Sequence, residues 1–164
     1  MRWSSTPLYG AHVSWRGHVE AGGGDPDEVW GAVTLLSESI SEVAVTRLRH
    51  AVAAAASAAG LAGDPLEDFV LAVHELVTNV VRHGGGGGRL RLLRDAASLS
   101  CEVTDHGPGT EDVPIALPRP GTPGHRGLWL AQQLTDSLVI DSGPDGTTAT
   151  VTARLSGVQS SRNR

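Results

Sequence analysis

The sequence contains no lysine, because all 13 of its basic residues are arginines. This absence excludes a Walker A phosphate loop, a Schiff base on a lysine amine, and the strand lysine of eukaryotic protein kinases. A protein of this composition that handles phosphate must use backbone N–H groups, a metal ion or arginine.

Positive charge, cysteine and long apolar runs are scarce as well. Thirteen basic against 18 acidic residues give a formal net charge of −5, which disfavours direct contact with nucleic acid. The single Cys101 excludes an internal disulfide and fits a reducing compartment. The N-terminal segment shows no signal peptide, and no segment approaches the roughly 20 apolar residues of a membrane span. These absences predict a cytoplasmic protein without membrane contact.

A chain of 164 residues is long enough for one compact domain with a buried core. We expect this domain at residues 30–156, between an N-terminal extension at 1–29 and a polar tail at 157–164. Most of the aromatic residues lie in or next to the extension, which also contains a glycine-rich break at 22–26. The extension is predicted to be flexible. Docking of its aromatic residues on the domain or on a partner remains the open alternative.

Alternating apolar residues predict strands that are separated by turn residues. The expected strands are 33–36, 89–94, 98–105, 137–141 and 147–155. A loop rich in proline and glycine is expected at 106–124, with a helix at 126–135 after it. Helices interspersed among hairpin-linked strands predict an α/β two-layer sandwich, in which helices cover one face of a mixed, mostly antiparallel sheet.

Two further helices are predicted in the first half of the chain. The first opens at a capping box formed by Ser39 and Glu42 and runs to Gly60. The second has Asp64 as its N-cap, with proline at the next position, and ends at His83. Apolar residues recur at helical spacing in both, so each helix has one face for the core.

The second helix carries two polar side chains beside its apolar face. Glu75 and Asn79 are four residues apart and therefore emerge together. The amide oxygen of Asn79 suits Mg²⁺, which prefers oxygen ligands, and Glu75 could accept a proton from a hydroxyl or water that attacks phosphate. A solvated helix edge would show the same pair, so the pair alone leaves both interpretations open.

The strand at 98–105 ends in a carboxylate. Asp105 shares the parity of Cys101 and Val103, which directs its side chain toward the buried side. Burial without a partner is costly, so a donor is expected, and the exocyclic amine of adenine is such a donor. Gly107 and Gly109 follow and allow a ligand to lie against the backbone. The alternative is an aspartate that caps its own turn, which is common for Asp-x-Gly.

Two glycine-containing segments complete the pattern. Residues 121–128 lead into a helix, whose free N–H groups and positive dipole end form a ready anion site. Arg126 could add charge there without a lysine. Later in the chain, Thr147 follows Gly146 and shares the inward parity of its strand. Each of these features is weak alone, because glycine loops before helices are frequent.

Taken in order, the four features resemble the GHKL ATPase superfamily. This superfamily has the Bergerat ATP-binding fold and includes gyrase, the histidine kinases and the bacterial anti-sigma serine kinases. The stretch Ala-Val-His-Glu-Leu-Val-Thr-Asn-Val-Val-Arg-His at 72–83, in a short chain, is most similar to the small anti-sigma kinases. The resemblance covers about residues 33–155.

The resemblance implies that the domain binds ATP and Mg²⁺. Glu75 would be the catalytic base, Asn79 the Mg²⁺ ligand, and Asp105 the residue that reads the adenine amine, assisted by Thr147. A mobile lid would lie within 106–124. The other residues implied along the nucleotide are His83, Gly107, Gly109, Gly124, Arg126, Gly127 and Leu128.

The resemblance further implies a function in transcription regulation. It is that of an ATP-dependent serine/threonine protein kinase, homodimeric, which binds a sigma factor and phosphorylates an anti-anti-sigma antagonist protein. One departure from the family is His125, which stands where relatives often have glycine and which bears on the phosphate cradle. The alternative is a non-catalytic ATP-binding module whose lid state controls partner binding. A sensor histidine kinase or a gyrase-type ATPase would need a further domain.

Overall fold

The computed structural model describes residues 12–16, 31–107 and 126–156. Its strands form one sheet in the order β1-β5-β6-β4-β3-β2. Strand β1 pairs with β5 in parallel, and all other neighbours are antiparallel. This arrangement confirms the predicted mixed, mostly antiparallel sheet. The strands are β1 (His12–Arg16), β2 (Val33–Ile40), β3 (Gly88–Arg94), β4 (Ser98–Asp105), β5 (Ser137–Gly143) and β6 (Gly146–Arg154).

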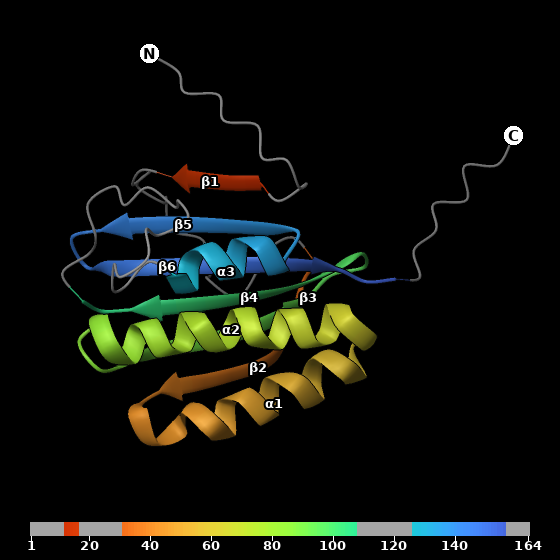
Figure 1. The fold of residues 1–164 in the computed structure, drawn as a ribbon, viewed down its shortest axis with the longest axis horizontal. Coiled ribbons are helices and arrows are strands. Elements are labelled where there is room, and N and C mark those ends of the chain that lie inside the picture. Colours follow the sequence, from red (N-terminus) through yellow and green to blue (C-terminus); the bar gives the residue numbers. More distant parts are fainter. Residues whose placement is uncertain (1–11, 17–30, 108–125, 157–164) are drawn as a thin grey trace, which may run out of the picture.

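The helices of the described residues cover one face of this sheet (Figure 1). Helix α2 lies between α1 and α3 and runs along the strands in the middle of the sheet. The predicted two-layer sandwich is therefore confirmed. The helical elements are a 3-10 turn η1 (Glu42–Ala44), α1 (Val45–Ala58), α2 (Gly63–His83) and α3 (Arg126–Leu134).

The core lies between α2 and the strands beneath it. Phe69 of α2 has no exposed surface, and neither have Leu92 of β3, Leu99 of β4 and Leu138 of β5. Helical spacing on α2 and alternation on the strands bring these side chains to the same interface. As a result, the polar residues that border the apolar face of α2 lie at the rim of the core.

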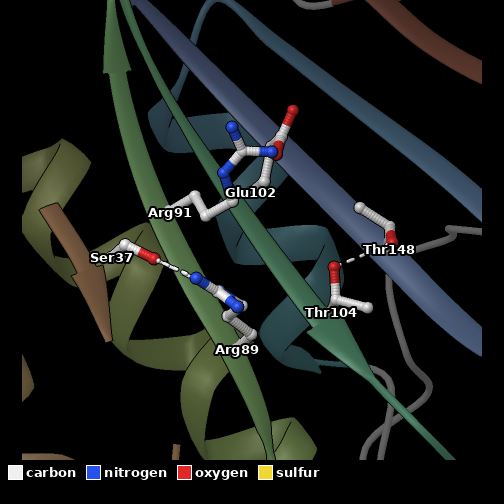
Figure 2. A network of polar contacts seen from close by, with 6 residues as sticks. All are labelled: Ser37, Arg89, Arg91, Glu102, Thr104 and Thr148. Atoms are coloured by element: carbon white, nitrogen blue, oxygen red, sulfur yellow. Dashed lines mark hydrogen bonds and ion pairs between the residues drawn. The ribbon is translucent and has the colours of Figure 1, made fainter. Parts of the chain in front are cut away.

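The opposite face of the sheet carries polar cross-strand contacts (Figure 2). Arg89 donates to Ser37 Oγ at 2.8 Å, and Arg91 lies 3.5 Å from a carboxylate oxygen of Glu102. The hydroxyls of Thr104 and Thr148 lie 2.9 Å apart across β4 and β6. Because this face carries no helix of the described chain, the polar groups expected to bind a ligand come from the helical layer and the strand ends.

The capping box predicted at Ser39 and Glu42 is wrong. Ser39 stays in β2, where it pairs with Arg89 of β3, and the strand continues to Ile40, which is 3% exposed. The helical segment starts after Ser41, whose side chain makes no cap hydrogen bond. Pairing with β3 and burial of Ile40 outweigh a local capping preference.

The start of α2 also differs from the prediction. The helix begins at Gly63 and its cap residue is the extended Ala62, with no side-chain cap hydrogen bond, so Asp64 is not the N-cap. Gly63 has φ +61°, a conformation that glycine adopts without penalty and that turns the chain into the helix. Asp64 lies within the first turn, where a negative charge favours the positive end of the helix dipole. The predicted end at His83 is confirmed.

Strand β1 lies within the expected N-terminal extension. It adds to the outer edge of β5, with Trp15 opposite Ile140. The remaining parts of that extension, at 1–11 and 17–30, and the tail at 157–164 lie outside the described residues. None of the helices in the described part of the chain is long and apolar enough to cross a membrane.

Candidate nucleotide-binding site

Asp105 ends β4 at the rim of the core. The alternation predicted for this strand is confirmed, because Leu99 and Cys101 are fully buried and Val103 is 2% exposed. Asp105 continues this parity and is half-buried. Burial raises the pKa of the Cys101 thiol well above its ordinary value, which makes that thiol an inert core residue.

One carboxylate oxygen of Asp105 is used within the protein. Its Oδ1 accepts hydrogen bonds from the backbone N–H of Gly107 at 3.0 Å and of Thr147 at 3.1 Å. The first bond shows that Asp105 does cap its own turn, while the second ties the turn to the start of β6. Among the described residues none donates to Oδ2.

Thr147 contributes its backbone as well as its side chain. Its hydroxyl lies 3.0 Å from the hydroxyl of Ser142 on β5, so the side chain is held across the hairpin. Its inward parity is confirmed by the burial of Ala149 and Val151 on the same strand face. Ser142 was not predicted as part of this site, because only the β5–β6 register brings it opposite Thr147.

Glu75 and Asn79 face the start of α3. A Cβ placed on Gly127 would lie 3.0 Å from Glu75 Oε2 and 3.3 Å from Asn79 Nδ2. Gly127 is buried, and the two side chains are half-buried. The pair predicted from helical spacing therefore lies against the N-terminal turn of α3, where N–H groups lack partners within the helix.

The other residues predicted along the nucleotide have different environments. Arg126, the first residue of α3, is exposed, whereas Leu128 is half-buried and packs against the core. His83 is exposed at the end of α2. Gly109, Gly124 and His125, and with them most of the expected lid, lie outside the described residues.

Two glycines pack against Asp105, and neither contact was predicted from the sequence. A Cβ on Gly84 would lie 2.6 Å from Asp105 Cβ, and a Cβ on Gly146 would collide with the Asp105 carbonyl oxygen. Gly107 packs in turn against the Gly84 backbone, since its Cβ would lie 3.2 Å from Gly84 Cα. The glycines at 84–87 connect α2 to β3, and nothing in the sequence signals the contact of Gly84 with β4.

The donor set fits Mg²⁺ bound together with phosphate. No group of three or more histidine, cysteine, aspartate or glutamate side chains is gathered for a metal within the described ranges. Mg²⁺ in nucleotide sites uses one or two protein oxygens, with phosphate and water completing the shell. The Asn79 amide at the close approach of Gly127 offers such an oxygen.

The chain matches the family of histidine kinase-like ATPase domains over residues 39–153, and it belongs to this family. The predicted resemblance to the GHKL superfamily is therefore confirmed, and the domain is of the ATP-binding type. No curated protein matches the chain.

Among solved structures, the chain is similar to the RsbU and RsbW domains of Rv1364c from Mycobacterium tuberculosis. The identity is 24%, the TM-score is 0.53, and the likeness covers 73% of this chain. The chain matches only 32% of that structure's length, so the likeness supports the fold and leaves activity to be tested.

Proposed function

We propose that this domain is an ATP-dependent serine/threonine protein kinase of the anti-sigma type. It would bind a sigma factor and phosphorylate a serine on an anti-anti-sigma antagonist protein. The observation that carries the proposal is the position of the Glu75 carboxylate, beside Gly127 at the start of α3. Membership of the histidine kinase-like ATPase family supports the ATP site. The anti-sigma assignment rests on the similarity of residues 72–83 to the small anti-sigma kinases.

The adenine would bind at Asp105. With Oδ1 held by two backbone N–H groups, the carboxylate has a fixed orientation and presents Oδ2 to the exocyclic amine. The Thr147 hydroxyl, held by Ser142, would assist on the same side. Gly107 packs against the Gly84 backbone and donates its N–H to Oδ1, which helps to hold the carboxylate in this orientation.

The phosphates would extend toward the N-terminus of α3. Free N–H groups there and the Arg126 guanidinium favour negative charge, so no lysine is needed. Asn79 would hold Mg²⁺, which neutralises charge on the triphosphate when bound.

Glu75 would act as the general base. The serine oxygen attacks the γ-phosphorus, the bond from phosphorus to the β–γ bridging oxygen breaks, and ADP leaves. The hydroxyl proton passes to the Glu75 carboxylate. Phosphoryl transfer requires little covalent chemistry from the protein, so placing Glu75 and the phosphates is the main contribution of these residues.

The test is transfer of label from γ-labelled ATP, with Mg²⁺, to candidate antagonist proteins. Glu75→Gln keeps the shape of the side chain and removes the base, so we expect transfer to fall by about 100-fold or more while ATP binding persists. Glu67→Gln, an exposed carboxylate on the same helix, is the matched control and should transfer at the wild-type rate.

Three other outcomes would contradict the proposal. Full transfer by Glu75→Gln would remove the proposed base. ATP binding without transfer to any antagonist would favour the non-catalytic module whose nucleotide state controls partner binding. No ATP binding by the wild type would refute both functions.

A further inference from the structure

Gly84 is the residue that follows α2. Its N–H donates to the Val80 carbonyl at 2.8 Å, which continues the hydrogen bonding of the helix. Its φ of −91° and ψ of 24° are open to residues other than glycine. By contrast, Gly85 and Gly86 have φ of +79° and +86°, which favour glycine. Backbone conformation therefore does not explain a glycine at position 84.

The space around Gly84 does explain it. A Cβ there would lie 2.6 Å from Asp105 Cβ, 2.9 Å from the Val80 carbonyl oxygen and 3.1 Å from Asp105 Cγ, so its shortest contact is with Asp105. Carbon atoms in favourable contact lie about 3.5–4.0 Å apart, so the Asp105 side chain would have to retreat by about 0.9 Å. The backbone at the end of α2 therefore contacts the side chain of Asp105 directly.

Asp105 is held on its other sides as well. Its Oδ1 accepts from the backbone N–H of Gly107 and of Thr147, and Gly146 packs against its carbonyl oxygen. Movement away from position 84 would stretch these bonds or press β4 into Gly146. Crowding at Gly84 would therefore act on the last turn of α2, through the Val80 carbonyl oxygen, and on the Asp105 side chain, whose displacement would move Oδ2.

We propose that Gly84 is a positioning residue that sets the selectivity of the site for the amino group of adenine. The inference rests on the proposed function, because it requires that Asp105 read a nucleobase. Gly84 touches no ligand itself. Because residue 84 has no side chain, the Asp105 side chain keeps its position, and Oδ2 keeps its place for the amine. A methyl group at position 84 displaces the carboxylate and weakens its hydrogen bond to the amine.

The test compares two nucleotides that differ only in that amine, ATP and purine riboside triphosphate. Wild-type protein should prefer ATP, and Gly84→Ala should lower ATP affinity about tenfold while leaving the purine analogue nearly unchanged. Gly87→Ala is the matched control from the same loop, because among the described residues its Cβ would meet only the Ile40 carbonyl oxygen, at 3.7 Å. It should keep the wild-type preference, with both affinities measured by titration calorimetry.

Each other result overturns the inference. An unchanged preference in Gly84→Ala would show that the position does not act on base recognition. Equal weakening of both nucleotides would assign Gly84 to the fold alone. Binding of neither nucleotide by wild-type protein would refute the proposed function, and the inference with it.

A double-mutant cycle keeps the inference testable if Gly84→Ala folds poorly. Asp105→Gly removes the two side-chain carbons that the new methyl group would meet. In urea unfolding, Gly84→Ala should therefore lower the free energy of unfolding more beside Asp105 than beside glycine at 105, where the contact with the Val80 carbonyl oxygen remains. Equal losses in the two backgrounds would show that the methyl group does not act on Asp105.

Discussion

Replacing Gly127 by alanine separates the stability of the fold from the function of the site. Gly127 lies in the first turn of α3 and is buried against α2. Alanine is favoured over glycine inside a helix by up to about 1 kcal/mol, and less near the helix end. Considered alone, this preference predicts that Gly127→Ala is as stable as the wild type or slightly more stable.

The new Cβ would crowd the candidate catalytic pair. It would lie 3.0 Å from Glu75 Oε2, with the two polar atoms of the Asn79 amide at 3.3 Å and 3.4 Å. These distances require shifts of a few tenths of an ångström, which half-buried side chains can make at small cost. Misplacement by about 1 Å can cost about 100-fold in rate, so displacement on this smaller scale should lower ATP affinity and transfer by about tenfold.

Two measurements check this reasoning. Urea unfolding should give a free energy within about 1 kcal/mol of the wild type, and calorimetry with ATP and Mg²⁺ should show the weaker binding. Gln133→Ala, at an exposed position of α3, raises helix propensity without approaching the site and should bind ATP normally. Wild-type affinity in Gly127→Ala would refute the placement of phosphate beside Glu75 and Asn79. Parallel loss of stability and affinity would show that the effect is one of folding.

Two further predictions concern the scaffold. Phe69→Ala, which empties a fully buried position on α2, should lower the free energy of unfolding by about 3–5 kcal/mol, whereas exposed Glu67→Ala should stay near the wild type in urea titrations. The Ser98 hydroxyl and then the Ala97 N–H hold the pKa of Asp95 below its ordinary value of 3.8. The carboxylate therefore stabilises the fold above that value, and this part of the stability is lost as pH falls through the folded pKa. When the free energy of unfolding is measured between pH 2 and 6, Asp95→Asn should lack this acid-dependent part. A pH profile identical to that of the wild type would contradict the stabilising role of Asp95 in its turn.

Local patterns in the sequence were sufficient to predict the parts of the site that lie on single elements. Helical spacing placed Glu75 and Asn79 side by side, and alternation placed Asp105 inward at the end of its strand. The resemblance to GHKL proteins implied that Gly127 lies along the nucleotide, and the structure adds its contact with the pair. Each of these predictions needed only the geometry of one element or one ordered set of motifs.

Three features that were not predicted, or were predicted wrongly, depend on neighbours far away in the chain. Ser39 reads as a helix cap in the sequence, yet pairing with Arg89 keeps it in β2. Strand β1 lies in a segment without a strong apolar pattern, and β5 provides its partner. The contact between Gly84 and Asp105 exists only because the end of α2 meets the end of β4. Tertiary packing decides all three, and a single-sequence pattern does not contain it.

Glycine accounts for how a site without lysine is assembled in this fold. Elements approach closely at Gly84, Gly107, Gly127 and Gly146, and at each position a side chain would meet Asp105, its turn or the Glu75–Asn79 pair. This close approach holds two groups of acceptors in place: the Asp105 carboxylate at the proposed adenine end, and the Glu75–Asn79 pair at the proposed phosphate end. Charge neutralisation is then left to the α3 N-terminus, Arg126 and a bound cation. The specificity of such a site depends on backbone packing, so it should be more sensitive to added methyl groups at these glycines than to loss of exposed charge.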